Sequence, residues 1–303
     1  MTSLTSTTER VTAGGVRAQL AVAVRAMRPR QWTKNVLLLA ALLFAGKAAE
    51  AALWPQAIGA VIAFCALSSA VYVVNDIHDV RQDRLHPTKR LRPLASGDLS
   101  IASGVCLAAL LVSIAFAVGA VVGSSFVVLL AVFAALQAAY TFALKRVPIV
   151  DVAAIALGFA LRAAAGAAAV DVRTSAWLIV CTILLACFLG FAKRRGELVH
   201  VRAAGGGGRS VLALYTQPLL DVLAWVTALA AVASYVVYTV VARDQAELLA
   251  TVPFVAFGVA RYLQLVHRRD LGEEPEVVLL SDVPILLTVT LWALTAMWIL
   301  TTS

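Results

Sequence analysis

The chain has 303 residues, of which 61% are hydrophobic and only 14% are charged, and its mean hydropathy is +0.89. A soluble domain of this size could not bury so much apolar surface, so the composition excludes a soluble globular protein and indicates a polytopic membrane protein. The formal net charge of +8 would suit a nucleic-acid ligand, but the positions of the basic residues explain it as membrane orientation instead.

The apolar residues fall into nine runs that approach the length of about 20 residues needed to cross about 30 Å of hydrocarbon. The runs lie at 35–50, 56–75, 99–122, 124–143, 150–170, 175–192, 218–241, 246–266 and 283–301. Residues 1–24 contain no uninterrupted apolar core of signal-peptide type, and we expect them to form a disordered tail. The sequence therefore predicts an all-α bundle of nine transmembrane helices within a single domain at 25–303.

Lys and Arg are distributed unevenly between the segments that join these runs. Alternate segments hold 20 basic residues, and they lie at 1–35, 77–98, 143–149, 193–217 and 267–282. The opposite segments hold only Lys47, Arg173 and Arg243. The positive-inside rule then predicts a multi-pass protein of the plasma (inner) membrane, with a cytoplasmic amino terminus and an external carboxyl terminus. The positive charge therefore gives no reason to expect a nucleic-acid partner.

The segment after the second run is dense in charge. Its acids Asp76, Asp79 and Asp83 stand at i, i+3 and i+7, which places them within roughly 60° of one face if the segment is helical. Three carboxylates on one face repel one another unless a cation lies between them, and Mg²⁺ takes oxygen ligands that it shares with substrate phosphates. Basic residues follow at Lys89, Arg90 and Arg92. The pattern favours a phosphorylated ligand held through a metal over a solvated loop of balanced charges.

Two ionisable residues lie in the fifth run. Asp151 and Arg162 are eleven residues apart, which on a helix returns them to within roughly 20° of one face and separates them by about 16 Å along the axis. Gly158 and Gly166 lie near that face and would let a neighbour approach closely. We expect this helix to line a polar cavity that faces the cytoplasm, with Asp151 near its mouth. The alternative is that Arg162 pairs with an acid for structural reasons alone.

Other charged side chains gather at the predicted cytoplasmic helix ends. Many of these cations would anchor the bundle to anionic lipid headgroups. Lys34 stands out because it follows Trp32 and begins the first span. Glu197 lies one turn after Lys193 and could pair with it or contribute a second contact to metal or phosphate.

The sequence Asn-Asp-x-x-Asp-x-x-x-Asp that begins at Asn75, after the second of nine spans, resembles the first aspartate-rich motif of the UbiA intramembrane prenyltransferase superfamily. The resemblance implies Mg²⁺ and diphosphate binding in a cavity that also opens to lipid. The chain departs from the superfamily at the second acidic motif, where residues 193–198 read Lys-Arg-Arg-Gly-Glu-Leu.

Four further stretches resemble one branch of that superfamily, the polyprenyl-phosphate phosphoribosyltransferases. They are Arg-Pro-x-Gln-Trp-x-Lys-Asn at 28–35, the run at 86–97, the stretch from Gly158 to Gly166, and Lys-Arg-x-x-Glu at 193–197. This resemblance implies a Mg²⁺-dependent pentosyltransferase that moves 5-phosphoribose from phosphoribosyl diphosphate to a polyprenyl phosphate, decaprenyl phosphate in actinobacteria, and releases diphosphate. The product would supply arabinose for cell-wall polymers.

On this interpretation the site residues take separate roles. The catalytic metal ligands would be Asp76, Asp79 and Asp83, with Asn75 orienting a carboxylate or contacting the donor. Cations would bind the leaving diphosphate, and the candidates are Lys89, Arg90, Arg92, Lys193 and Arg194. The C5 phosphate would be bound by Lys34, Lys145 or Arg162. A lipid phosphate is already anionic near neutral pH, so no general base is expected.

Two other functions compete with this one. The first is a prenyltransferase that moves an isoprenyl group onto an aromatic or other acceptor, and the second is a transporter or channel that uses Asp151 and Arg162. The sequence leaves the oligomeric state open, a homo-oligomer included.

Overall fold

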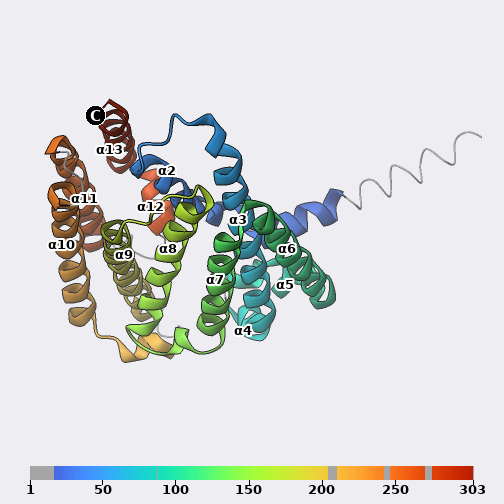
Figure 1. Cartoon of the computed structure of the whole chain (residues 1–303). Coiled ribbons are helices and arrows are strands. Elements are labelled where there is room, and N and C mark those ends of the chain that lie inside the picture. The colour runs from blue at the N-terminus through green and yellow to red at the C-terminus, as the bar shows by residue number, and fades with distance from the viewer. Residues whose placement is uncertain (1–16, 87, 204–209, 242–245, 270–274, 303) are drawn as a thin grey trace, which may run out of the picture. The chain divides into compact units, whose positions relative to one another are not determined.

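The computed structural model describes residues 17–86, 88–203, 210–241, 246–269 and 275–302, and every regular element within them is a helix (Figure 1). The α-helices are α2 (Ala40–Phe44), α3 (Trp54–His78), α4 (Val80–Leu85), α5 (Pro93–Ser96), α6 (Ile101–Val122), α7 (Ser124–Phe142), α8 (Val150–Ala169), α9 (Ala176–Ala203), α10 (Gln217–Val241), α11 (Val252–Arg269), α12 (Pro275–Ser281) and α13 (Val283–Thr302). The 3-10 helices are η1 (Pro29–Leu39), η2 (Ala51–Leu53), η3 (Lys89–Leu91), η4 (Leu144–Arg146), η5 (Ser210–Leu214) and η6 (Ala246–Thr251).

Eight helices of the described residues are long and apolar enough to cross a membrane, and they correspond to the second to ninth predicted runs. The all-helical, multi-pass architecture is therefore confirmed. The first predicted run, 35–50, instead forms the end of η1 and the five-residue α2. The ninth span accordingly stays a prediction.

The predicted amino-terminal tail needs correction. Residues 1–16 lie outside the described residues, but residues 17–27 are helical. The sequence from Arg17 to Met27 is Ala-rich and lacks Gly and Pro, which favours a helix where we predicted disorder over 1–24.

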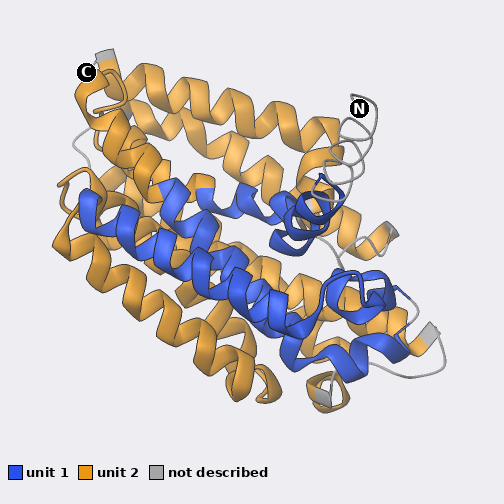
Figure 2. Ribbon diagram, turned by 90° about the vertical axis from the view of Figure 1, so that its right-hand side faces the viewer, with its two compact units in different colours: residues 1–35, 61–121 blue, residues 36–60, 122–303 orange. Residues whose placement is uncertain are grey.

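The chain divides into two compact units, which Figure 2 shows in separate colours. The first consists of Met1–Asn35 and Val61–Val121, and the second of Val36–Ala60 and Val122–Ser303. In the first unit, Ala26, Val73, Leu94 and Ala108 form a small buried core.

The second unit is built around α9, which packs against both α8 and α10. Its core includes Val152 of α8, Phe188 of α9 and Tyr262 of α11, all nearly inaccessible to solvent. The two helices α8 and α9 approach closely at Gly190, where an added Cβ would lie 2.6 Å from the Val152 side chain. Gly166 of α8 allows a similarly close approach to the backbone of Leu38, which an added Cβ would overlap.

Candidate active site

The acidic segment is not one continuous helix. α3 ends at His78, and Asp79 adopts φ −92° and ψ 6° before α4 begins at Val80. This turn redirects the chain between the first and third acids. The prediction that all three carboxylates share one helical face is therefore wrong for Asp79, because the backbone bends at that residue.

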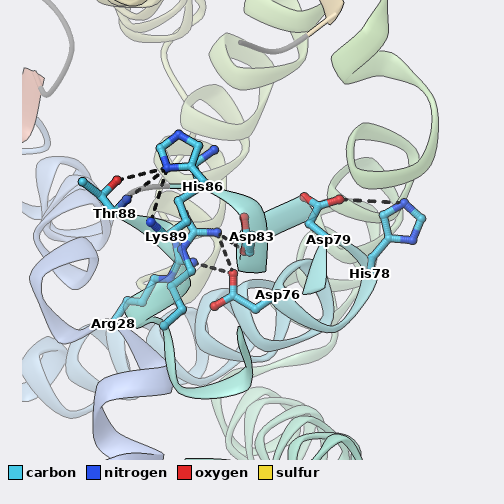
Figure 3. A network of polar contacts seen from close by, with 9 residues as sticks. Arg28, Asp76, His78, Asp79, Asp83, His86, Thr88 and Lys89 are labelled. Carbon is cyan, nitrogen blue, oxygen red and sulfur yellow. Dashed lines mark hydrogen bonds and ion pairs between the residues drawn. The ribbon is translucent and has the colours of Figure 1, made fainter. Parts of the chain in front are cut away.

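Asp76 and Asp83 converge on the same arginine within the first unit. Arg92 Nη1 donates to Asp83 Oδ2 at 2.6 Å and to Asp76 Oδ1 at 3.2 Å. Arg28 Nη2 also donates to Asp76 Oδ1, at 2.5 Å. The two carboxylates are 4% and 5% exposed, whereas the two arginines are 27% and 28% exposed. Two buried acids are thus neutralised by two cations that keep contact with solvent (Figure 3).

Asp79 lies apart from this cluster, toward His78 (Figure 3). Its carboxylate is 31% exposed and lies 4.0 Å from His78 Nε2. Within the residues that the structure describes, no three His, Cys, Asp or Glu side chains are grouped closely enough to hold a metal ion. Arginine nitrogens hold the carboxylate oxygens of Asp76 and Asp83.

Arg28 is a site residue that sequence reasoning missed, since it lies 48 residues from its partner Asp76 along the chain. Its φ of +55° is unusual for a side chain with a Cβ, and Pro29 follows it directly. The guanidinium lies over the ring of Tyr72, 5.1 Å from the centroid. Tyr72 in turn contacts Gln31, to which Lys34 Nζ donates at 2.5 Å. The predicted residue Lys34 is therefore connected to the acidic cluster through three neighbours.

The remaining predicted residues of this unit surround the turn. The Oδ1 atom of Asn75 is buried and accepts no hydrogen bond from the described residues. His86 Nδ1 accepts from the backbone N–H groups of Thr88 and Lys89, which shapes the loop before Arg92. Lys89 is half-buried and Arg90 is exposed.

A second polar cluster lies in the other unit, at the start of α8. Asp151 is fully buried, and its Oδ2 accepts from Arg194 Nε at 2.6 Å. Its Oδ1 accepts from the Tyr215 hydroxyl at 2.8 Å. The same hydroxyl accepts from the N–H of Ile149, whose φ is +67°. Burial, together with the hydrogen bond to Asp151, raises the pKa of Tyr215, which keeps this phenol protonated.

Arg194 joins this cluster to the remainder of α9. It is only 1% exposed and donates to Glu197 at 2.5 Å and to the Tyr140 hydroxyl at 3.4 Å. Glu197 therefore pairs with Arg194 in addition to any contact with Lys193. Tyr140 and Tyr215 were missed from the sequence, since they lie 54 and 64 residues from their partners Arg194 and Asp151 and belong to no charged motif.

The other predicted site residues of this unit are less closely connected to the cluster around Asp151. Arg162 is buried on α8, where Nη1 donates to the Gly158 carbonyl at 3.0 Å and the guanidinium lies 4.6 Å from the centroid of the Phe133 ring. Lys145 in η4 and Lys193 on α9 are both half-buried. Asp151 and Arg162 are both buried, and the cavity that their spacing predicts stays a prediction.

The fold and the aspartate-rich turn define a class of intramembrane transferase. Residues 36–283 match the UbiA prenyltransferase family, and the chain belongs to that family. It is similar to the decaprenyl-phosphate phosphoribosyltransferase of Corynebacterium glutamicum, at 36% identity over 86% of this chain and 80% of the relative. A protein of the same name from Mycolicibacterium smegmatis is 33% identical over 89% of this chain and 90% of that protein.

Among solved structures, a UbiA homolog from Archaeoglobus fulgidus bound to GPP and Mg²⁺ superposes with a TM-score of 0.71. The superposition covers 93% of this chain and all of the homolog, at 17% sequence identity. At that identity the similarity establishes the fold.

Proposed function

We propose that this protein transfers 5-phosphoribose from phosphoribosyl diphosphate to a polyprenyl phosphate, with decaprenyl phosphate as the expected acceptor. The observation that carries the proposal is the similarity, along most of the chain, to relatives named decaprenyl-phosphate phosphoribosyltransferase. The reaction breaks the bond between C1 of ribose and the diphosphate oxygen. It forms a bond between C1 and an oxygen of the lipid phosphate, and diphosphate leaves with the bonding electrons.

The donor set near α3 fits a hard divalent cation in its chemistry. Asp76, Asp83 and the unpaired Oδ1 of Asn75 are all oxygen donors, which is the ligand type that Mg²⁺ prefers. These three side chains would hold the ion. Asp79 stays a predicted metal ligand on the basis of the motif alone. Bound Mg²⁺ would act as a Lewis acid on the leaving diphosphate.

The arginines of the first unit supply the remaining positive charge. Arg28 and Arg92 are about one quarter exposed, so their guanidinium groups are accessible to a phosphorylated donor. Arg can bind phosphate oxygens in a bidentate manner, and Lys34, Lys89 and Arg90 would add charge nearby. Fixed cations aimed at developing negative charge are a principal source of rate acceleration in transfer reactions.

We assign the second unit's residues to binding and support. Asp151, with Tyr215, holds the buried Arg194 in one orientation, and Glu197 fixes its other end. Lys145, Arg162 and Lys193 keep their proposed roles on the donor's phosphates. The amino terminus is expected in the cytoplasm of a cell whose plasma membrane contains the lipid acceptor.

The test is an assay of the purified protein with phosphoribosyl diphosphate labelled in the ribose and with decaprenyl phosphate in detergent. We expect label in the lipid fraction that requires Mg²⁺ and disappears with EDTA. Binding of Mn²⁺ measured by electron paramagnetic resonance gives a readout independent of turnover, and Asp76→Asn should weaken it. Absence of labelled lipid in the presence of Mg²⁺ would contradict the proposal.

The competing prenyltransferase function is distinguished from phosphoribosyl transfer by replacing phosphoribosyl diphosphate with a prenyl diphosphate donor. The family includes prenyltransferases by name, so geranyl diphosphate with an aromatic acceptor is the matched reaction. Turnover of geranyl diphosphate without turnover of phosphoribosyl diphosphate would favour the alternative.

A further inference from the structure

A groove on the second unit lies between α10 and α11, and none of the residues that line it is assigned a role above. It has a volume of about 460 Å³ and is lined mainly by apolar side chains. The groove is hollow because small side chains line it, namely Ala228 and Val232 of α10 and Ala256 and Ala260 of α11. Both helices are long and apolar enough to cross a membrane. Trp225 and Leu229, which line the groove, are 48% and 65% exposed, so the groove opens on the outside of the second unit.

The groove is polar at one end only. Gln264, His267 and Arg268 line that end, near the terminus of α11. Trp225 lies beside them, with its ring 5.9 Å from the His267 ring. Tryptophan is enriched where a membrane protein meets the headgroup region, so this end is the interfacial one. The basic residues of segment 267–282 assign it to the predicted cytoplasmic leaflet.

Among the described residues that line the groove, the charged side chain at this end is a cation, Arg268. Asp221 Oδ1 lies 2.6 Å from Arg195 Nε and 3.2 Å from His267 Nε2, so Arg195 already neutralises that carboxylate. Arg268 is exposed, and no ion pair with a described residue involves it. An exposed cation at the lipid interface attracts an anionic headgroup by about 1 kcal/mol.

The length of the groove matches one leaflet. From Ala256 to Arg268 the helix rises about 18 Å, and half of a hydrocarbon core of about 30 Å is about 15 Å. We propose that this groove binds an anionic phospholipid of the membrane, with its phosphate at Arg268 and an acyl chain along the apolar part. A second copy of the chain fits less well, because a two-fold contact would bring like charges at Arg268 together.

The experiment measures lipid retention by native mass spectrometry of the full-length protein in detergent. Phosphatidylglycerol and phosphatidylcholine with identical acyl chains are added in parallel. We expect phosphatidylglycerol to bind with higher affinity to the wild type, and Arg268→Gln to reduce that affinity about fivefold. Arg202→Gln is the matched control, since Arg202 is exposed at the end of α9 and lies outside the groove.

A second pair of variants tests the apolar part. Ala260 is exposed in the groove, so Ala260→Trp should fill it and abolish preferential binding without disturbing the core. Val226→Trp places the same ring on the exposed face of α10 outside the groove, and it should leave binding unchanged. Equal retention of the two lipids by the wild type, or unchanged retention in Arg268→Gln and Ala260→Trp, would overturn the proposal. A dimer that dissociates in Ala260→Trp would assign the groove to a second copy and overturn it as well.

Discussion

The Asp151–Arg194 pair and the Asp221–Arg195 pair offer a matched comparison. In each, an aspartate accepts from an arginine Nε at 2.6 Å, but Asp151 is fully buried and Asp221 is 31% exposed. Truncation of Asp151 to alanine leaves Arg194, itself 1% exposed, without one of its two carboxylates. Arg195 is also buried, at 7% exposed, but it keeps a hydrogen bond to the Val266 carbonyl when Asp221 is removed. Breaking a fully buried ion pair costs about 3–5 kcal/mol, and a pair with one solvent-exposed partner costs less because water screens it.

We therefore expect Asp151→Ala to lower the free energy of unfolding by about 3 kcal/mol, the lower bound, because Glu197 still compensates the arginine. Asp221→Ala should cost less than Asp151→Ala, because the Asp221 carboxylate is 31% exposed. Equilibrium unfolding by dodecyl sulfate in mixed micelles, followed by circular dichroism, measures both. Each residue lies near the start of a helix, so the change in helix propensity cancels in the comparison. Equal destabilisation by the two variants would refute the reasoning.

Three further predictions concern the site. Asp76→Ala and Asp79→Ala should each remove most labelled-lipid formation while the helical circular dichroism is kept, and normal turnover in either variant would remove that residue from the site. Arg162→Ala should weaken donor affinity in equilibrium dialysis if the guanidinium binds phosphate; unchanged affinity with a lower melting temperature would assign it to packing against Phe133. Burial raises the pKa of Tyr215 in the folded chain above the ordinary value of 10.0. As pH rises, the unfolded chain therefore loses the phenol proton at a lower pH than the folded chain does. Wild-type stability should then fall as pH rises above about 10, and Tyr215→Phe should lack that part of the loss in denaturant titrations from pH 9 to 11.

The architecture was largely predictable from the sequence, because hydropathy reports directly on transfer into a membrane. Eight of the nine predicted runs are helices of spanning length, and the family resemblance is confirmed. The first run was harder because its apolar residues form a 3-10 segment and one short helix. Hydropathy measures apolar content, and it does not distinguish these helical types.

The site was predictable in composition but not in geometry. The spacing of the three acids predicted a cluster, and Asp76 and Asp83 do meet at Arg92, but helical periodicity could not reveal the turn at Asp79, which lies apart. The positive φ of Arg28 leaves no signature in the sequence. The contact of Tyr215 with Asp151 spans 64 residues and comes from an uncharged side chain, so charge patterning could not find it.

The hydroxyl of Tyr215 also has a bearing on biosynthesis. It accepts a hydrogen bond from the N–H of Ile149, a residue 66 positions earlier that lies just before α8 with a φ of +67°. During translation, α8 therefore leaves the ribosome well before the phenol that completes its amino-terminal end. Chains arrested between these two points would carry an unfinished α8, and should be more accessible to proteases there than chains released after residue 215.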